Sequence, residues 1–260
     1  AEANMIGLAA GMARCGDMPF VHSFSVFLTR RAFDQVAMQI AYPKLNVKLA
    51  GFLPGLTTLL GVSHQAIDDL ALMRVLPNMT IIEPSGANQT AVAVRAAAKI
   101  DGPVYLRLHK DKKVITDAEV EKTLEVGKGQ MLRDGDDAVI FASGYMVAEA
   151  LLAAETLCMS GIKLAVANMH TLKPFDCDFV LKHSIRTGVV VSAENHSVIG
   201  GLGSAVAEVL AERPTDEVIQ FKRIGISDTF AEGGTKNYLF DKYGLSARHI
   251  TMAVLELLKR

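Results

Sequence analysis

The chain has 260 residues, of which 50% are apolar and 21% charged, and its 27 basic and 28 acidic residues give a net charge of −1. This composition argues against disorder, coiled coil and collagen, supplies a sizeable core, and leaves no basic excess to neutralise nucleic-acid phosphates. No apolar run approaches the roughly 18 residues that span a bilayer, and the three cysteines form no CxxC pair, so a reducing, cytoplasmic location without disulfides or zinc is expected.

The first half of the chain alternates between strand and helix patterns. Residues 2–13 form an apolar-faced helix that Gly16 ends. Because the sequence opens inside that helix, we expect a fragment or one subunit of a split protein. The following elements are expected as strands at 19–23, 45–50, 79–83 and 104–108 and helices at 28–41, 64–76 and 86–100, with Pro77 ending the helix at 64–76.

A charged stretch after residue 108 interrupts the alternation, which then resumes. We expect one domain over 1–110, a linker over 111–128 and a second domain over 129–260. The second domain has expected strands at 137–143, 162–168, 188–194 and 218–224 and helices at 146–160, 176–186, 203–211 and 246–259. Alternating strands and helices with short connections predict an α/β protein made of two tandem doubly wound domains with mainly parallel sheets.

Five side chains are candidates for chemistry, and each also has an ordinary structural interpretation. Glu2 lies in the first turn of a helix, where a carboxylate favours the helix dipole. Phe24 and Phe27 are three residues apart, as core aromatics often are. His64 ends a long loop, the kind of segment that commonly carries function, but it is equally well interpreted as an ordinary residue at the start of a helix. Arg107 lies near the end of a strand, where open sheets bind ligands, although a surface arginine needs no ligand.

Two further motifs carry little weight. The glycines of 199–205 do not satisfy GxGxxG and are expected to allow a tight strand-to-helix turn rather than to hold a nucleotide. The segment RDGDD at 133–137 precedes a strand and is expected to be a turn rather than a metal loop. The sequence has no G-x-S-x-G elbow, so a serine-hydrolase triad has no support.

Several segments follow the order and spacing of one family. AEANMIGLAAGMA at 1–13, PFVHSFSVFLTRRAFDQV at 19–36 and GVSHQAIDDLALMRVLPNMTIIEP at 61–84 resemble the glutamate, aromatic and histidine segments of the transketolase family. TLKPFD at 171–176 and VVSAENHSVIGGLGSAVAEVLAE at 190–212 are similar to its C-terminal domain. The resemblance spans essentially the whole chain and implies a pyrimidine-binding domain followed by a transketolase C-terminal domain.

The resemblance implies thiamine diphosphate as cofactor. Glu2 would bond N1′ of its aminopyrimidine ring and favour the imino tautomer, whose N4′ takes the proton from thiazolium C2. Phe24 and Phe27 would form the stacking wall for the ring. Arg30 would occupy the next position beside it, where transketolases proper place an aromatic residue and deoxyxylulose-phosphate synthases an arginine; Arg31 replaces it if the alignment slips by one.

The resemblance also implies substrate contacts. His64, the second expected catalytic residue, would bond hydroxyl or carbonyl oxygens in the substrate channel, and Arg107, or less surely Lys110, would meet a sugar phosphate. Two positions depart from the family. Leu60 stands roughly where transketolases have a carboxylate that binds the acceptor's hydroxyl, and Phe52 stands where they have a histidine that helps bind phosphate. Both put the usual pentose-phosphate substrates in question and leave the cofactor-activating residues intact.

One family motif is missing from the sequence. Transketolases hold the diphosphate and Mg²⁺ through a GDG motif followed downstream by Asn, whereas residues 134–136 here read Asp-Gly-Asp without that partner. We therefore expect the diphosphate and Mg²⁺ to be held by an upstream segment or a separate subunit, and the chain on its own to bind the cofactor weakly or not at all. Because the family's cofactor lies between protomers, a homodimer or heterotetramer is expected.

These features predict the C-terminal half or small subunit of a transketolase, which transfers a two-carbon ketol unit between sugar phosphates once its diphosphate-binding partner is present. A 1-deoxyxylulose-5-phosphate synthase and the beta chain of a 2-oxo acid dehydrogenase are the enzyme alternatives. The SHQ–MR–LPNM–IEP run favours the transketolase interpretation over the beta chain. The non-enzyme alternative is a cofactor-free assembly domain that kept the fold.

Overall fold

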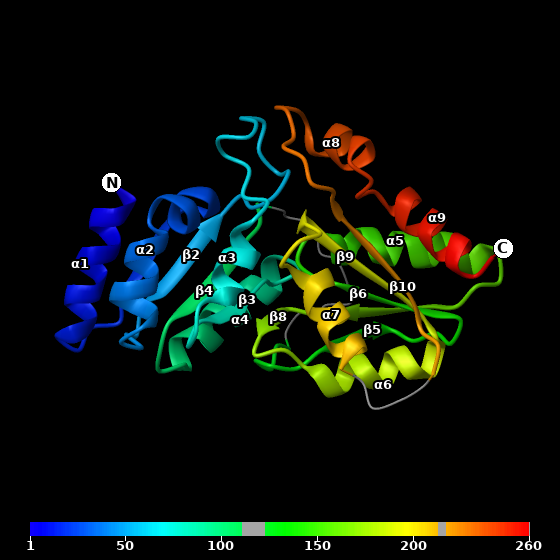
Figure 1. The fold of residues 1–260 in the computed structure, drawn as a ribbon, viewed down its shortest axis with the longest axis horizontal. Coiled ribbons are helices and arrows are strands. Elements are labelled where there is room, and N and C mark those ends of the chain that lie inside the picture. Colours follow the sequence, from blue (N-terminus) through cyan, green and yellow to red (C-terminus); the bar gives the residue numbers. More distant parts are fainter. Residues whose placement is uncertain (111–122, 213–216, 260) are drawn as a thin grey trace.

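The computed structural model describes residues 1–110, 123–212 and 217–259. It has two α/β halves side by side, each built on a five-stranded sheet (Figure 1). The expected fold class is confirmed. Within the described residues, no helix combines the length and the apolar character needed to cross a membrane.

The helices and strands follow the expected alternation, with additions described below. The first half contains α1 (Glu2–Arg14), β1 (Phe20–Phe24), the π-helix η1 (Phe27–Arg31), α2 (Phe33–Gln35), the π-helix η2 (Val36–Ala41), β2 (Lys48–Phe52), α3 (Asp69–Val75), β3 (Thr80–Ile82), α4 (Ala87–Lys99) and β4 (Val104–Leu108). The second half contains β5 (Gln130–Arg133), β6 (Ala138–Ala142), α5 (Met146–Met159), β7 (Leu164–Asn168), β8 (Thr171–Lys173), α6 (Cys177–Thr187), β9 (Val189–Ser197), α7 (Leu202–Ala211), β10 (Gln220–Ile226), α8 (Lys236–Lys242) and α9 (Ala247–Leu257).

The first sheet has the order β1-β2-β4-β3-β8, and its first four strands are parallel. Strand β8 comes from the second half of the chain and pairs antiparallel with β3, with Ile81 opposite Lys173. Strand β8 is not among the predicted strands, because three residues before a proline carry no strand periodicity. The first sheet is therefore completed by the second half of the chain.

The second sheet has the order β10-β9-β6-β7-β5. Helices α5 and α9 lie on one face and α6 and α7 on the other (Figure 1). Strand β5 pairs antiparallel with β7 and was also missed, since its four residues are all half-buried and show no alternation between apolar and polar side chains. Helix α8 was the third missed element.

Two expected helices differ from the structure. The helix expected over 28–41 is divided into η1, α2 and η2; the Thr29 hydroxyl donates to the carbonyl of Ser25 at 2.8 Å, a local bond that competes with regular helix. The helix expected from His64 begins only at Asp69, because Ala66 instead pairs with the preceding loop and accepts a 2.8 Å bond from the Gly55 amide. Both irregular segments carry candidate site residues, as π-helical turns often do.

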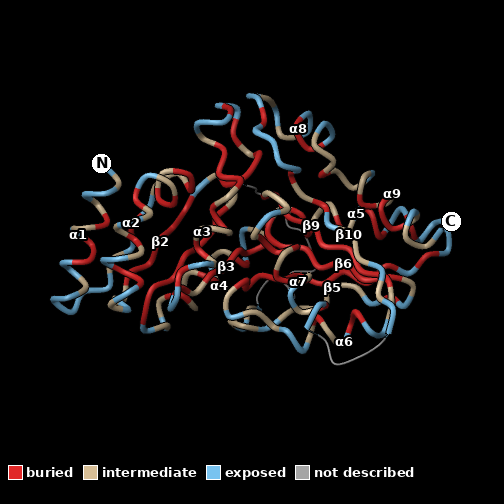
Figure 2. Tube along the Cα trace, viewed as in Figure 1, coloured by how far each residue is buried: buried red, intermediate tan, exposed pale blue. Residues whose placement is uncertain are grey.

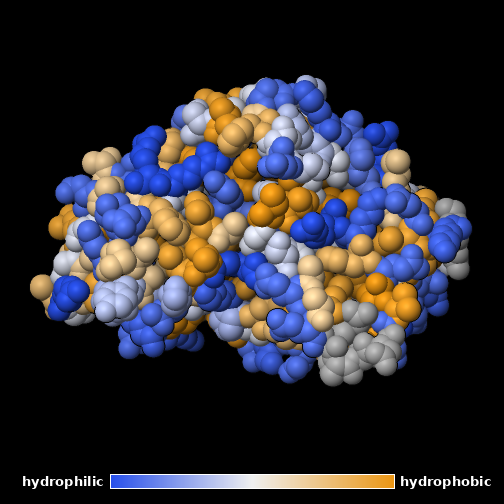
Figure 3. Space-filling model, viewed as in Figure 1, coloured by the Kyte–Doolittle hydropathy of each residue, from blue (hydrophilic) through white to orange (hydrophobic). Residues whose placement is uncertain are grey.

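The two halves share buried surface. The sheets and their inner helix faces are buried, whereas the outer helix faces are exposed (Figure 2). One hydrophobic cluster contains Leu70 and Met73 of α3 together with Leu202 and Val206 of α7. On the face seen in Figure 3, apolar side chains gather in patches among charged ones. The shared cluster fixes the second half against the helix that follows the His64 loop.

The glycine run before α7 is a structural turn. The buried Glu194 carboxylate accepts the amides of Leu202 and Gly203 at 2.7 and 2.8 Å and so satisfies the start of the helix. A Cβ on Gly201 would lie 1.8 Å from Oε2 of Glu194, so only glycine admits this approach. The expected tight turn is confirmed, and a carboxylate of the chain itself takes the position that a nucleotide phosphate would need.

Candidate active site

Three parallel strands deliver the candidate residues to one edge of the first sheet. Phe24 ends β1, Phe52 ends β2 and Leu108 ends β4, and all three strands run in the same direction. The loop after β2 leads to His64. Ligands of open α/β sheets bind at the carboxyl ends of the strands, which is where these segments meet.

Three rings form a compact cluster at this edge. The ring centroids of Phe24 and Phe27 are 5.5 Å apart, and the His64 imidazole lies 5.3 Å from the first and 5.1 Å from the second. Such tilted and edge-on contacts are the favoured aromatic geometry. The structure therefore brings together three residues that are separated by up to forty positions in the sequence.

The Glu2 carboxylate faces the same region from α1. Its side chain is 14% exposed; Oε1 accepts from the Ser23 hydroxyl at 3.3 Å and Oε2 from Nη1 of Arg31 at 3.2 Å. The pKa of Glu2 is below its ordinary value because its own backbone N–H bonds to it, burial opposing this and Arg31 adding to it. The Glu2 carboxylate is thus held ionised, largely out of solvent, beside the cluster of Phe24, Phe27 and His64.

Arg31 shows that one flat group can contact both the carboxylate and the aromatic wall. Its Cζ lies 3.9 Å from the centroid of the Phe27 ring while Nη1 donates to Glu2. A planar ring that carries a hydrogen-bonding nitrogen at its edge likewise needs an aromatic face to stack on and a carboxylate to bond its nitrogen. The arrangement of Glu2 and Phe27 therefore fits an aminopyrimidine ring.

Arg30 is not placed as expected. Its Nε donates to both carboxylate oxygens of Asp68, at 2.8 and 3.0 Å, and it lines a pocket of about 240 Å³ with Phe230 and Ser197 of the second half. The contact with Phe27 is made by Arg31 instead. The structure therefore gives Arg30 a partner in Asp68 rather than a contact with the Phe27 ring.

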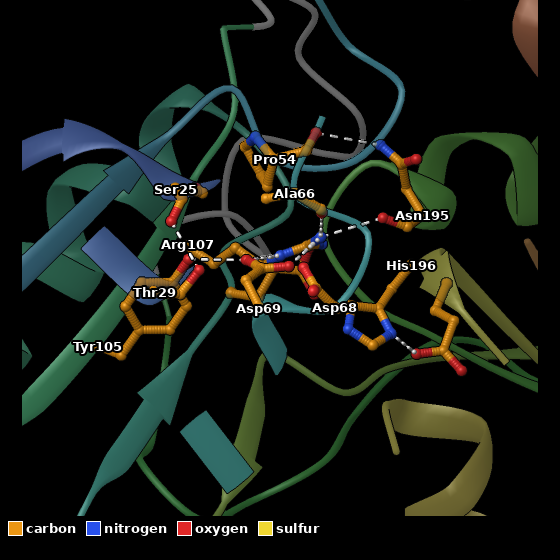
Figure 4. Close-up of polar contacts among 12 residues, drawn as sticks. Ser25, Thr29, Pro54, Ala66, Asp68, Asp69, Tyr105, Arg107, Asn195 and His196 are labelled. Atoms are coloured by element: carbon orange, nitrogen blue, oxygen red, sulfur yellow. Dashed lines mark hydrogen bonds and ion pairs between the residues drawn. The ribbon is translucent and has the colours of Figure 1, made fainter. Parts of the chain in front are cut away.

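Arg107 also requires a correction. Its side chain is fully buried and donates to Asp69 at 2.7 and 3.0 Å, to Glu83 at 2.5 Å and to two backbone carbonyls (Figure 4). Burial opposes the charge, but Asp69 and Glu83 outweigh it and raise the pKa of Arg107. The Tyr105 hydroxyl completes the cluster with a 2.7 Å bond to Asp69. Because the N–H groups of this guanidinium are bonded to other residues of the chain, Arg107 does not bind a sugar phosphate.

Glu83 links this cluster to the second half. It accepts from Nε2 of His109 at 2.8 Å, and although burial acts in the opposite direction, Arg107 and His109 hold its pKa well below the usual range. A Cβ on Gly144 would lie 2.4 Å from Glu83 Oε1. The buried ion cluster and the glycine before α5 are therefore in direct contact across the two halves.

Lys110 lies beside a pocket at the carboxyl ends of β2 and β4. It is exposed and lines a pocket of about 310 Å³ together with Phe52, Leu53, Leu108 and His109. The departing residue Phe52 is 39% exposed in this pocket, and Leu60 is 58% exposed on the His64 loop. A mainly apolar pocket with an ammonium group at its rim suits a substrate that ends in an anionic group.

Sequence reasoning missed Asp69, Glu83 and Asn195. Glu83 directly follows the buried strand β3, and Asn195 lies in the polar second half of β9, which is buried as far as His196. Polar side chains in such positions need buried partners, and that need was the available signal. The partners of Asn195 depend on how the two halves pack, and those of Asp69 and Glu83 on how α3, β3 and β4 pack within the first half, which no local pattern gives.

Comparison with known proteins agrees with this geometry. Residues 1–113 match the model of the transketolase pyrimidine-binding domain and residues 127–250 that of the transketolase C-terminal domain. The 6-deoxy-6-sulfo-D-fructose transketolase subunit SqwH of Clostridium sp. (strain MSTE9) is 48% identical over 261 residues, covering 100% of this chain and 80% of its own length. A putative transketolase C-terminal section from Methanocaldococcus jannaschii is 42% identical, covering 100% and 81%.

A solved structure described as a split gene transketolase, inactive beta4 tetramer, superimposes with a TM-score of 0.91 and 46% identity, covering 100% of this chain and 82% of that one. The two domain models, the near-complete alignments and this superposition give one answer: the chain belongs to the transketolase family.

Proposed function

We propose that this chain is the C-terminal subunit of a thiamine-diphosphate-dependent transketolase and transfers a two-carbon ketol unit once it is paired with a diphosphate-binding subunit. The observation that carries the proposal is the joint placement of Glu2 and Phe27, which one planar group already contacts together. A cofactor-free assembly domain has no need to hold a sheltered carboxylate against an aromatic wall.

Each residue then has a defined task. Bound thiamine diphosphate supplies the carbon nucleophile of the reaction. Glu2 bonds the ring nitrogen of the aminopyrimidine and holds a proton there, and Phe24 and Phe27 exclude water from one side of the ring. His64, whose Nδ1 lies 2.9 Å from the Ser63 hydroxyl, bonds a hydroxyl or carbonyl oxygen of the substrate.

The partner subunit completes the site. The sequence lacks the GDG motif with its downstream Asn, so the partner supplies the diphosphate and Mg²⁺ contacts. Relatives described as a transketolase subunit and as a split gene transketolase that is inactive as a beta4 tetramer support a two-subunit enzyme. The assembly that we propose is a heterotetramer of two chains of each kind, with the cofactor bound between subunits.

The donor is proposed to be a ketose with an anionic terminus. Lys110 at the rim of the apolar pocket is the cation available for that terminus, and Phe52 replaces the expected phosphate-binding histidine. One relative is named for a sulfonated fructose, so sulfonate and phosphate donors are to be compared directly. Lys110→Ala should raise the KM for the preferred donor without changing the KM for the cofactor.

The deciding experiment reconstitutes the chain with a GDG-bearing, diphosphate-binding transketolase subunit. Ketol transfer from ketose phosphates and sulfonates to aldose acceptors is measured against pyruvate-dependent condensation and pyruvate decarboxylation. Ketol transfer supports the transketolase proposal. Activity with pyruvate alone would assign the chain to the synthase or dehydrogenase alternative, and an inactive complex that still assembles would support the cofactor-free domain.

A further inference from the structure

The second half of the chain holds the loop that carries His64. This loop runs from the end of β2 to the start of α3 and contains no helix or strand of its own. A side chain on such a loop is positioned only as well as the loop is. The contacts that fix the loop to the second half are therefore relevant to the proposed substrate contact.

The first contact is made by Asn195. Its Oδ1 accepts the Leu56 amide at 2.9 Å and its Nδ2 lies 3.5 Å from the carbonyl of Pro54, a pair that Figure 4 shows above the Arg107 cluster. Asn195 is almost completely buried, and its own carbonyl accepts from Arg107 at 3.0 Å. The buried ion cluster thus fixes Asn195, and Asn195 fixes the start of the loop.

The second contact is made beside His64 itself. Nε2 of Gln65 donates to the backbone carbonyl of Glu232 at 3.0 Å. The Glu232 carboxylate accepts from the Tyr238 hydroxyl at 2.7 Å, from Nζ of Lys242 at 2.5 Å and from the Tyr243 hydroxyl. These bonds tie the segment before α8 to α8, so the carbonyl that meets Gln65 is held in place.

The backbones of the loop and the second half also touch directly. The loop and the segment before α8 lie side by side at the upper edge of the molecule (Figure 1). A Cβ on Gly233 would lie 2.7 Å from the Leu59 carbonyl oxygen, and a Cβ on Gly55, whose φ is +62°, would lie 2.4 Å from Cγ of Asn195. Both approaches require glycine, which means that the loop is packed closely rather than loosely covered.

We propose that Asn195 and Glu232 are positioning residues that set the place of His64 in the substrate channel, so that the C-terminal domain contributes to substrate binding without touching the substrate. The link to substrate binding rests on the proposed function. The attachment of the loop to the second half is independent of the proposed function. The attachment and its effect on substrate binding are therefore tested separately.

The attachment is tested by hydrogen–deuterium exchange on the full chain. Asn195→Ala should speed exchange in peptides covering 53–66 by about tenfold, with peptides from β1 and β4 unchanged, because Leu56 loses the acceptor of its amide. Glu232→Ala replaces a partly exposed side chain and should speed exchange in the same peptides. It provides the test if Asn195→Ala fails to fold. Unchanged exchange in 53–66 for a folded variant overturns the proposal.

The consequence is tested in the reconstituted enzyme. Glu232→Ala should raise the KM for the ketose donor about fivefold, as expected for about one net hydrogen bond, and leave the cofactor KM unchanged. Glu256→Ala, which removes a 2.5 Å pair with Lys222 in the same half, is the matched control and should leave both values unchanged.

A double-variant cycle decides whether the effect passes through His64. In a His64→Ala background, Glu232→Ala should have no further effect on donor KM. An equal fivefold effect in both backgrounds would overturn the positioning role. If the reconstituted enzyme shows no ketol transfer at all, the proposed function fails, while the exchange result still decides whether Asn195 and Glu232 hold the loop.

Discussion

The guanidinium of Arg31 lies over the ring of Phe27, with Cζ 3.9 Å from the ring centroid. The same group donates to Glu2, at 3.2 Å. Arg31 is therefore placed where the proposed aminopyrimidine contacts would form, and cofactor binding requires it to move. Its side chain is 60% exposed, so it can swing into solvent.

Replacing Arg31 should consequently strengthen cofactor binding. An exposed ion pair and an exposed cation–π contact together contribute about 1 kcal/mol, so Arg31→Ala should lower the apparent KM of the reconstituted enzyme for thiamine diphosphate by about fivefold. Arg14→Ala, an exposed arginine at the end of α1, serves as the control. A raised cofactor KM in Arg31→Ala would show instead that the guanidinium helps to bind the cofactor.

Glu2→Gln should lower the turnover of the reconstituted enzyme by about 10² to 10⁴, the range for loss of a positioned proton-holding group. An amide preserves shape but cannot hold a proton, so the loss should appear in kcat rather than in assembly with the partner. The measurement is steady-state ketol transfer, with thermal unfolding of the variant as a check on folding. Unchanged turnover would remove Glu2 from the mechanism and favour the assembly-domain alternative.

The isolated chain should show no calorimetric binding of thiamine diphosphate with Mg²⁺ at micromolar concentrations, whereas the reconstituted complex should bind both. The physical reason is that the ring contacts bury only part of the cofactor and leave its diphosphate charge unmatched. Isothermal titration on both samples is the measurement. Micromolar affinity of the isolated chain would mean that it contains its own diphosphate site.

The fold could be predicted from sequence because its signals are local. Buried β-branched strands such as β3 and β9 and apolar-faced helices such as α1 follow from periodicity. The strands that were missed, β5 and β8, are short antiparallel additions whose pairing depends on distant chain segments. The π-helical turns were missed because their extra residue per turn leaves no sequence periodicity to detect.

The site was predictable only in part. The meeting of Phe24, Phe27 and His64 follows the resemblance of their segments to the family. Arg107 could not be interpreted correctly, because a surface arginine and a buried one look identical in sequence. Its carboxylate partners, Asp69 and Glu83, come from α3 and from the end of β3 in the same half, and only the packing of these elements against β4 places them beside it.

The buried imidazole of His170 should make stability depend on pH. Burial lowers its pKa to about 4, against about 6.5 in an unfolded chain. Below pH 6.5 the unfolded state therefore binds more protons than the folded state, and the stability contribution present at pH 7 is lost as the pH falls toward 4. Between pH 7 and 5 this one group should cost about 2 kcal/mol.

Urea unfolding of the wild type and of His170→Gln at pH 7 and pH 5 measures this contribution. The variant should lose about 2 kcal/mol less than the wild type over that interval. His22→Gln, at an exposed histidine, should leave the pH dependence as it is in the wild type. Identical pH slopes for the wild type and His170→Gln would mean that the imidazole is accessible to protons in the folded state.

Replacing Arg107 should lower the folding stability of the chain rather than weaken substrate binding. Removing its charge by Arg107→Leu leaves Asp69 buried without its counter-ion and Glu83 with His109 alone, which should destabilise the chain by about 3 to 5 kcal/mol in urea unfolding. Arg107→Lys keeps the charge but not the planar fork that reaches both carboxylates, and should lose an intermediate amount. If Arg107→Lys unfolds like the wild type while the KM for a phosphorylated donor rises, the guanidinium reaches the substrate after all. A loss of stability with an unchanged donor KM in the surviving folded enzyme would show that this arginine stabilises the fold and does not contact the substrate.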